Sequence, residues 1–260
     1  MSQFRVGVQV QPQHASFDAM RRAWQEADAL GVDSIFTWDH FFPLYGEADG
    51  AHFEGITSLT ALAASTSHAQ VGALVICNSY RNPELLADAH RTIDHVSGGR
   101  AILGIGAGWF KRDYDEYGYE FGEARDRLAD LRQAMPRIKD RLGKLNPAPL
   151  GKLPILIGGS GPKVTLKLVA QYANMWHSFG DADDYKRKND ILLEHCANEG
   201  RDPSEIERTW GVNGDDILQH ADSLADAGVQ HLIVGIGGEG DGYDLSSLKE
   251  LVKWRDARNG

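Results

Sequence analysis

The chain has 260 residues, a length within the range of one α/β barrel and sufficient to bury a large core. It carries 27 Lys and Arg residues against 37 Asp and Glu residues, a formal net charge of -10, which argues against non-specific nucleic-acid binding and against a polybasic membrane surface. We expect neither a signal peptide nor a membrane span, because no basic start precedes an apolar run and no apolar run approaches the roughly 20 residues needed. Two isolated cysteines without a Cys-x-x-Cys motif suit a reducing cytoplasm.

Apolar patterning along the chain alternates between strand-like runs and amphipathic helical segments. After the first strand, Met20, Trp24 and Ala27 recur at helical spacing, and Gly31 marks the end of the helix. The pattern predicts strands at 4–10, 32–38, 70–77, 101–105, 153–157, 173–178, 206–212 and 230–236. It predicts helices at 15–30, 57–67, 84–96, 122–142, 162–172, 181–199, 215–227 and 243–257, and an aromatic and charged loop at 109–121.

Eight strand-plus-helix units, one per about 32 residues, are the repeat expected of a (β/α)8 TIM barrel. Right-handed parallel crossovers leave few other arrangements for such a chain. The alternative is an open doubly wound sheet, which usually has fewer strands. We therefore expect a single barrel domain over residues 1–260, in which the residues that follow each strand share one rim.

Two glycine-rich loops follow predicted strands and would lie on that rim. The fourth strand runs into Gly104, Gly106 and Gly108, where the backbone can approach a bulky anion closely and direct several N–H groups at it. The fifth strand ends in Gly-Gly-Ser-Gly-Pro at 158–162, directly before a helix, and such a helix start is suited to phosphate. Plain chain-reversing turns are the alternative for both loops.

An Asp-His pair and several aromatic side chains complete the predicted rim. Asp39 and His40 follow the second strand and form a candidate acid–base unit, because histidine titrates near neutral pH. Neighbouring residues of an extended segment point in opposite directions, so one of the two is expected to face the cavity. A structural histidine, hydrogen-bonded in the barrel wall, is the alternative. The aromatic residues at strand ends, which are either ring-stacking groups or wall filler, are Trp38, Trp109, Trp176 and Phe179.

Three other motif interpretations fail on inspection. Residues 235–240 match Gly-x-Gly-x-x-Gly after a strand, but no further strand remains to complete a dinucleotide-binding unit. Ser160 lacks the second glycine of a nucleophile elbow, because that position is Pro162. His40, His52 and His177 form no His-x-His or His-Glu-x-x-His motif, so we predict no metal site.

The strand ends TWDHF, NSYRNP, GIGAGW and ILIGGSGP, taken in order over nearly the whole chain, resemble the luciferase-like monooxygenase superfamily and its actinobacterial branch of coenzyme F420-dependent oxidoreductases. The resemblance implies a TIM barrel that binds F420 or FMN at its C-terminal mouth. It implies that His40 lies at the reactive edge of the ring with Asp39 beside it, and that strand three contains a bulge with a non-proline cis peptide at Leu74–Val75. The cofactor-binding residues that it implies are Trp38, Leu74, Val75, Asn78, Gly106, Ala107, Gly108, Trp109, Gly158, Gly159, Ser160 and Gly161, with both glycine loops on the phosphate.

The expected protein is a cytoplasmic oxidoreductase that exchanges a hydride between F420 and a small organic substrate, with His40 handling the proton and Asp39 supporting it. Tyr80 and Trp176 are expected to shape the substrate side. An FMN-dependent luciferase-like monooxygenase and a non-catalytic deazaflavin-binding protein are the alternatives. Relatives that oxidise sugar phosphates carry Glu after the strand-four glycines, whereas this chain has Trp109, which argues against such substrates. The resemblance also implies a homodimer.

Overall fold

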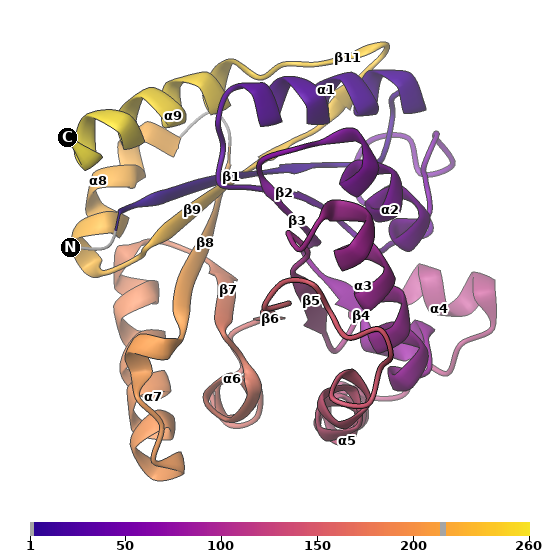
Figure 1. The fold of residues 1–260 in the computed structure, drawn as a ribbon, viewed down its shortest axis with the longest axis vertical. Coiled ribbons are helices and arrows are strands. Elements are labelled where there is room, and N and C mark those ends of the chain that lie inside the picture. Colours follow the sequence, from indigo (N-terminus) through magenta and orange to yellow (C-terminus); the bar gives the residue numbers. More distant parts are fainter. Residues whose placement is uncertain (1–2, 214–216) are drawn as a thin grey trace.

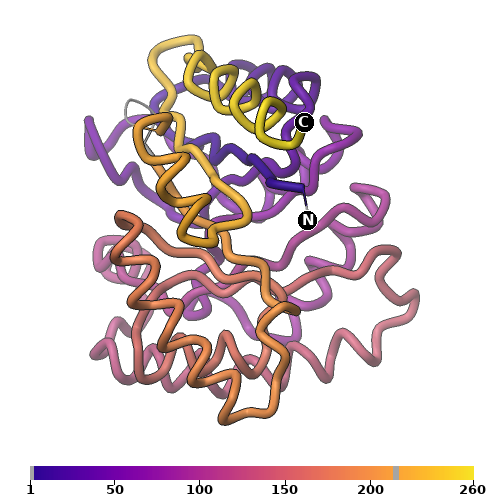
Figure 2. The backbone as a smooth tube through the Cα atoms, turned by 90° about the vertical axis from the view of Figure 1, so that its left-hand side faces the viewer, coloured from indigo at the N-terminus to yellow at the C-terminus, as the bar shows by residue number. Residues whose placement is uncertain are grey.

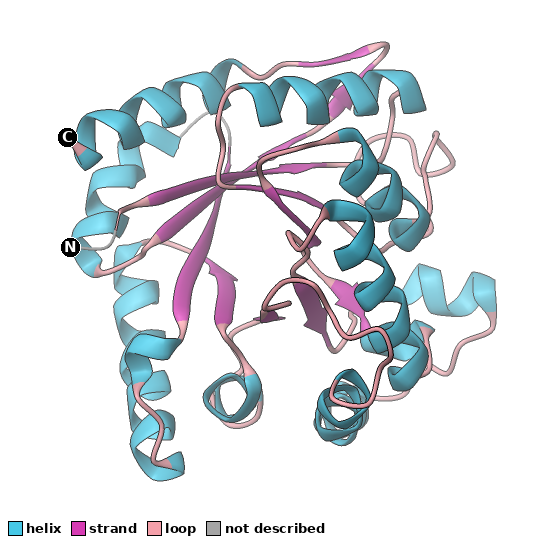
Figure 3. Cartoon of the chain, viewed as in Figure 1, coloured by secondary structure: helices cyan, strands magenta, loops and turns pink. Residues whose placement is uncertain are grey.

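The computed structural model describes residues 3–213 and 217–260. Its strands lie at the centre of the molecule with helices around them (Figures 1 and 3). The main sheet has the order β3-β2-β1-β9-β8-β7-β6-β5-β4, and all of its pairs are parallel. Its strands are β1 (Arg5–Val10), β2 (Ser34–Thr37), β3 (Gln70–Ala73), β4 (Ile76–Cys77), β5 (Leu103–Gly106), β6 (Ile155–Gly158), β7 (Met175–Phe179), β8 (Glu207–Asn213) and β9 (His231–Ile236).

The sheet closes through its third strand, which the structure divides into β3 and β4. The break lies at Leu74–Val75, whose peptide bond is cis, as the sequence resemblance implied. On one side of the break, Val71 forms a parallel bridge with Ala101, and on the other β4 pairs with β5. Counting β3 and β4 as one interrupted strand gives eight strands around a barrel, so the predicted (β/α)8 fold is confirmed, with the predicted third strand at 70–77 interrupted at the cis peptide bond.

The helices cover the outside of the barrel. They are α1 (Phe17–Ala29), α2 (Gly55–Ser65), α3 (Pro83–Ser97), α4 (Lys111–Tyr117), α5 (Ala124–Leu142), α6 (Thr165–Tyr172), α7 (Ala182–Glu199), α8 (Ile217–Ala227) and α9 (Ser246–Asn259), with short 3-10 turns η1 (Asn78–Tyr80) and η2 (Pro203–Glu205). Figure 2 shows α9 beside β1, so the two ends of the described chain lie together.

Two elements differ from the predicted helices and loops. Helix α4 lies where a loop was expected, because seven residues rich in charge give too short a pattern for helical periodicity to show. A small hairpin of β10 (Gly238–Glu239) and β11 (Gly242–Tyr243) precedes α9, so that helix begins three residues later than expected. The predicted start of the helix at residue 215 lies outside the described residues.

The interior of the barrel is filled below the rim. A cluster of apolar side chains occupies it: Phe36, Ile102, Leu156, Met175 and Ile233. Leu74 and Val75, at the break in the third strand, pack on this cluster. The barrel is therefore a packed core with the break of the third strand as its upper layer, and any ligand has to bind above it.

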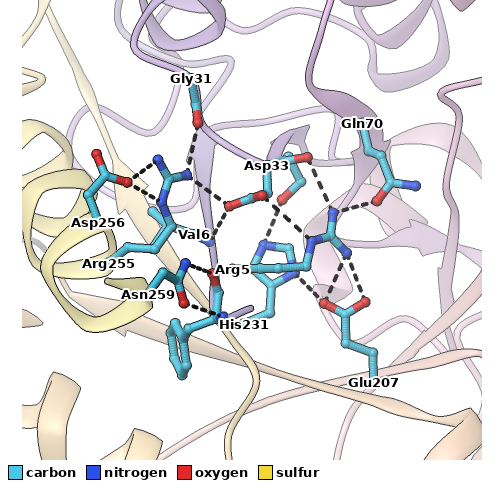
Figure 4. Close-up of polar contacts among 12 residues, drawn as sticks. Arg5, Val6, Gly31, Asp33, Gln70, Glu207, His231, Arg255, Asp256 and Asn259 are labelled. Carbon is cyan, nitrogen blue, oxygen red and sulfur yellow. Dashed lines mark hydrogen bonds and ion pairs between the residues drawn. The ribbon is translucent and has the colours of Figure 1, made fainter. Parts of the chain in front are cut away.

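At the other end of the strands, polar side chains join the start of β1 to its neighbours (Figure 4). Arg5 donates two hydrogen bonds to Glu207, at 2.8 and 3.0 Å, and Glu207 also contacts Nδ1 of His231 at 2.9 Å. Asp33 accepts from Arg255 of α9 at 2.9 Å. This network connects β1, β8, β9 and the last helix at the end opposite the rim. Polar contacts at this end of a barrel stabilise the fold.

The closeness of β5 to the broken strand gives a stability prediction. A Cβ at Gly104 would overlap the carbonyl of Ala73, whereas one at Gly143, which has φ -70°, would find its nearest neighbour at 3.6 Å. Gly104→Ala should lower the free energy of unfolding by about 1–3 kcal/mol, and Gly143→Ala should leave it nearly unchanged. Urea unfolding of both variants measures the difference, and equal midpoints would contradict the packing described for β5.

A buried histidine on α3 gives a pH prediction. Nδ1 of His90 lies 3.1 Å from the carbonyl of Leu86, its Nε2 has no partner among the described residues, and burial lowers its pKa to about 4. As the pH falls, the unfolded chain binds a proton at His90 before the folded chain does. The stability that the neutral ring gives to the fold is therefore complete above pH 6.5 and is lost as the pH falls towards 4. The free energy of unfolding falls by about 2 kcal/mol between pH 7 and pH 5 from this group. In urea unfolding between pH 7 and pH 5, the free energy of unfolding of His90→Leu should fall by about 2 kcal/mol less than that of the wild type. The exposed control His220→Leu should behave as the wild type. An equal loss in the wild type and His90→Leu would refute the assignment.

Candidate active site

The rim at the carboxyl ends of the strands surrounds two adjoining cavities. The glycine lobe, of about 300 Å³, is lined by Asp39, His40, Leu74, Val75, Ile76, Cys77, Tyr80, Gly106, Ala107, Gly108, Trp109, Gly158, Gly159, Thr165, His177 and Phe179. The glutamine lobe, of about 260 Å³, is lined by Gln9, Gln11, Trp38, His40, Leu44, Tyr45, Leu74, Trp109, His177, Phe179, Gly211, Val212, Ile233 and Gly235. The residues common to both, here called the shared wall, are His40, Leu74, Trp109, His177 and Phe179.

The glycine lobe has an apolar floor and a side made of backbone. Val75 fills the space beside two of the glycines, since a Cβ at Gly106 would lie 2.7 Å and one at Gly158 2.9 Å from its methyl groups. These two glycines are therefore required by packing against the broken strand. Among the described residues, the N–H groups of residues 108, 109, 160 and 161 find no acceptor, and neither does the hydroxyl of Thr165 at the start of α6. Residues 108, 109 and 165 line the lobe, which thus combines a flat apolar surface with these free donors, whereas residues 160 and 161 belong to the adjoining loop after β6.

His40 is held by a buried carboxylate from α4. Its Nδ1 lies 2.7 Å from Oδ2 of Asp113, which is fully buried and also accepts hydrogen bonds from the Tyr80 hydroxyl and the Phe41 N–H, both at 3.0 Å. A carboxylate can only accept, so Nδ1 carries the proton and Nε2 is the nitrogen left for the cavity. Burial raises the pKa of Tyr80 well above its usual range, which keeps its hydroxyl a donor. His40 is therefore fixed in ring orientation and tautomer.

Asp39 does not support His40, contrary to our expectation. Its carboxylate receives two hydrogen bonds from Arg81, at 2.6 and 2.9 Å, and one from the Cys77 N–H at 3.0 Å. Arg81 also donates a hydrogen bond to the carboxylate of Glu54, at the start of α2. The opposite orientation of successive residues sends Asp39 into this ion pair and His40 towards Asp113. Burial raises the pKa of Asp39, and the Arg81 guanidinium and the Cys77 N–H reduce this rise.

Most of the other predicted site residues border the cavities. Leu74, Val75, Gly106, Ala107, Gly108, Trp109, Gly158 and Gly159 line the glycine lobe, and Trp38 lines the glutamine lobe. Asn78, Ser160 and Gly161 line neither lobe. Trp176, expected on the substrate side, is instead fully buried between Tyr185 and Trp210, with its indole N–H donating to the carbonyl of Gly159 at 2.8 Å.

Two uncharged histidines adjoin His40. Burial lowers the pKa of His177 to about 3, and its Nδ1 lies 2.8 Å from the hydroxyl of Thr209, which itself donates to a backbone carbonyl. His177 therefore donates from Nδ1 and presents Nε2 as an acceptor. Burial also lowers the pKa of His52 to about 4, and this ring accepts the indole N–H of Trp38 at 3.0 Å. Both rings are neutral at physiological pH.

Sequence patterns missed the residues that come from unexpected elements. Asp113 lies on the unpredicted helix α4, and no sequence pattern pairs Arg81, of the NSYRNP segment, with Asp39. Thr165 carries no motif of its own. An acidic residue in a loop beside an aromatic cluster is the only signal that pointed to Asp113, and it is weak without the fold.

Neither a metal centre nor a membrane helix is seen in the part of the chain that the structure describes. Within residues 3–213 and 217–260, no group of three or more His, Cys, Asp or Glu side chains is arranged to hold a metal ion. Over the same residues, every helix is too short or too polar to cross a bilayer.

Comparison with curated proteins finds relatives that share part of the chain. An F420-dependent glucose-6-phosphate dehydrogenase of Amycolatopsis mediterranei (strain U-32) is 29% identical over 164 residues, covering 56% of this chain and 47% of the relative. One of Kineococcus radiotolerans is 38% identical over 115 residues, covering 44% of this chain and 34% of the relative. The chain therefore matches less than half the length of these relatives.

Solved structures of similar fold cover much more of the chain. An F420-dependent secondary alcohol dehydrogenase in complex with an F420-acetone adduct superposes with a TM-score of 0.83 at 15% identity, over 95% of this chain and 98% of the other. A coenzyme F420-dependent tetrahydromethanopterin reductase from Methanopyrus kandleri superposes with a TM-score of 0.78 at 16% identity, over 100% of both. At these identities the likeness concerns the fold.

The sequence model of one family spans most of the chain. That model, described as luciferase-like monooxygenase, matches residues 1–237, which include both glycine loops, the broken third strand and His40. The chain belongs to the luciferase-like monooxygenase family.

Proposed function

We propose that this protein is an oxidoreductase that binds coenzyme F420 in the glycine lobe and exchanges a hydride with a small organic substrate in the glutamine lobe. The observation that carries the proposal is the shared wall, where a histidine of fixed tautomer lies between a lobe suited to a flat phosphorylated ring and a second lobe. The relatives named as F420-dependent dehydrogenases and the F420-dependent structural neighbours support the choice of cofactor.

The residues present fit this cofactor. Leu74, Val75 and Ile76 offer an apolar surface to one face of a tricyclic ring. Within the lobe, the N–H groups at 108–109 and the Thr165 hydroxyl, which have no acceptor among the described residues, offer donors to a phosphate. When bound, F420 accepts or supplies a hydride at its ring.

In the oxidation direction, the chain has to receive the proton that leaves the substrate. His40 presents the lone pair of Nε2 to the cavity and takes this proton. The carboxylate of Asp113 stabilises the imidazolium that forms, because it accepts the Nδ1–H at 2.7 Å in a buried position. Trp109 and Phe179, 61% and 66% exposed at the mouth, are placed to be covered by bound ligand and to exclude water.

The alternatives are less supported. An FMN-dependent monooxygenase would use the same ring and phosphate contacts, but the curated relatives are named for F420. A protein that only carries the deazaflavin would have no need for an Asp-His pair at the wall between two lobes. The homodimer, the cytoplasmic location and the single domain over residues 1–260 remain predictions.

Cofactor choice is tested by direct binding. Oxidised F420 and FMN are titrated separately into the purified protein, and the fluorescence of its tryptophans, two of which line the lobes, reports occupancy. We expect saturable quenching by F420 at least 10-fold tighter than by FMN. Tight binding of FMN with none of F420 would replace the proposal by the monooxygenase alternative.

The proton role is tested with variants of His40 and of its partner on α4, Asp113. F420 reduction is followed with the fastest member of a panel of 2-propanol, 1-phenylethanol and glucose 6-phosphate. His40→Gln should lower turnover by about 10²- to 10⁴-fold and retain F420 binding. Asp113→Asn should lower turnover and retain F420 binding, because the variant removes the carboxylate that orients His40 and pairs with its imidazolium.

Asp115→Asn is the matched control, since Asp115 lies on the same helix but is exposed and pairs with Lys111 at 2.6 Å. It should leave the rate unchanged. Turnover of Asp113→Asn equal to that of the wild type would refute the pairing role, and F420 binding without turnover of any panel member would favour the carrier protein.

A further inference from the structure

We propose that the glutamine lobe takes an uncharged, ring-containing secondary alcohol, or the ketone related to it, and rejects phosphorylated substrates. This inference rests on the proposed F420-dependent function and specifies its substrate class. It departs from the names of the curated relatives, which are glucose-6-phosphate dehydrogenases.

The first argument is charge. The described residues that line the glutamine lobe include no Lys, Arg, Asp or Glu. Among the described residues, the outer cavity of about 450 Å³ beyond Phe179 adds one carboxylate, Asp181, and an exposed histidine, His220, but no Lys or Arg. A phosphate dianion placed here would lose hydration without gaining a cation, which costs several kcal/mol per ion. An uncharged molecule carries no such cost.

The second argument is the set of hydrogen-bonding groups that the fold leaves unused. Within the described residues, the side-chain amide of Gln11 contacts no donor or acceptor of the protein, and Gln9 uses only its Nε2, on the carbonyl of Leu74 at 2.8 Å. Both lie over Gly235, where a Cβ would come 3.6 Å from Nε2 of Gln11 and 3.9 Å from Oε1 of Gln9. His177 adds an acceptor at Nε2. One neutral donor and several neutral acceptors match a hydroxyl or a carbonyl group.

The third argument is the shape of the walls. The indoles of Trp38 and Trp109 and the rings of Tyr45 and Phe179 form flat aromatic sides. Gly211 lets the Phe179 ring pack against the backbone of β8, because a Cβ there would lie 2.5 Å from that ring and 3.2 Å from Nε2 of His177. Aromatic walls bind flat or ring-shaped apolar groups well.

The reaction that this lobe supports is a two-electron exchange. The C–H bond of the carbinol carbon breaks and its hydride passes to oxidised F420, while the hydroxyl proton goes to Nε2 of His40 and a C=O bond forms. Alcohol and oxidised cofactor thus become ketone, reduced cofactor and a proton on His40. The reverse direction reduces the ketone with the same groups.

The inference is tested by calorimetric titration of pairs between which no hydride can pass: protein loaded with reduced F420 is titrated with 1-phenylethanol and glucose 6-phosphate, and protein loaded with oxidised F420 is titrated with acetophenone. We expect saturable binding of the two neutral ligands and none of the sugar phosphate. Gln11→Ala should weaken binding of 1-phenylethanol about 2- to 12-fold, the loss of one hydrogen bond, and Val212→Arg should abolish it. Gln171→Ala, which changes a glutamine of α6 that contacts Glu199, should leave it unchanged.

The outcomes separate the two proposals. Failure to load F420 contradicts the proposed function itself. Normal loading combined with binding of glucose 6-phosphate, or with binding of neither class of ligand, overturns the inference on substrate class alone. If F420 binding survives in Gln11→Ala and Val212→Arg while alcohol binding falls, both proposals are supported.

Discussion

The arrangement of the site depends on one buried carboxylate. Asp113 accepts hydrogen bonds from His40, from Tyr80 and from the backbone of Phe41, and so joins the loop after β2, the turn η1 and helix α4. Because no water competes for it, each donor is held in place, and the histidine can present only Nε2 to the cavity. The same carboxylate positions the wall between the lobes and supplies the counterion for a proton there.

A second constraint comes from the barrel itself. The third strand is interrupted at residues 74–75, and Val75 packs where side chains of β5 and β6 would otherwise lie, so Gly106 and Gly158 have to be glycines. What resembles a ligand-binding glycine motif in the sequence is therefore partly a packing requirement. Among the described residues, the backbone donors of the lobe that remain for a ligand are the neighbouring N–H groups at 108–109, and those at 160–161 lie on the loop that follows β6. Fold and cofactor site thus use the same two loops for different reasons.

This division explains how far the sequence could be interpreted without the structure. Alternating strands and helices were sufficient for the barrel and for the gathering of the rim, and the ordered motifs indicated the break at Leu74–Val75. The partner of His40 could not be predicted, because Asp113 is distant in sequence and lies on a helix too short to show periodicity. Asp39 was the nearest acidic residue along the chain, but strand geometry turns it towards Arg81.

The central claim is that Asp113 fixes His40 with its proton on Nδ1 and its Nε2 facing the cavity. The most direct measurement is nitrogen-15 NMR of the protein labelled at histidine, in which couplings of the ring nitrogens to the ring protons distinguish the two tautomers. The account predicts an Nδ1–H resonance for His40 at neutral to mildly alkaline pH, lost or displaced in Asp113→Asn. An Nε2–H tautomer, or a His40 signal that does not respond to Asp113, would contradict it.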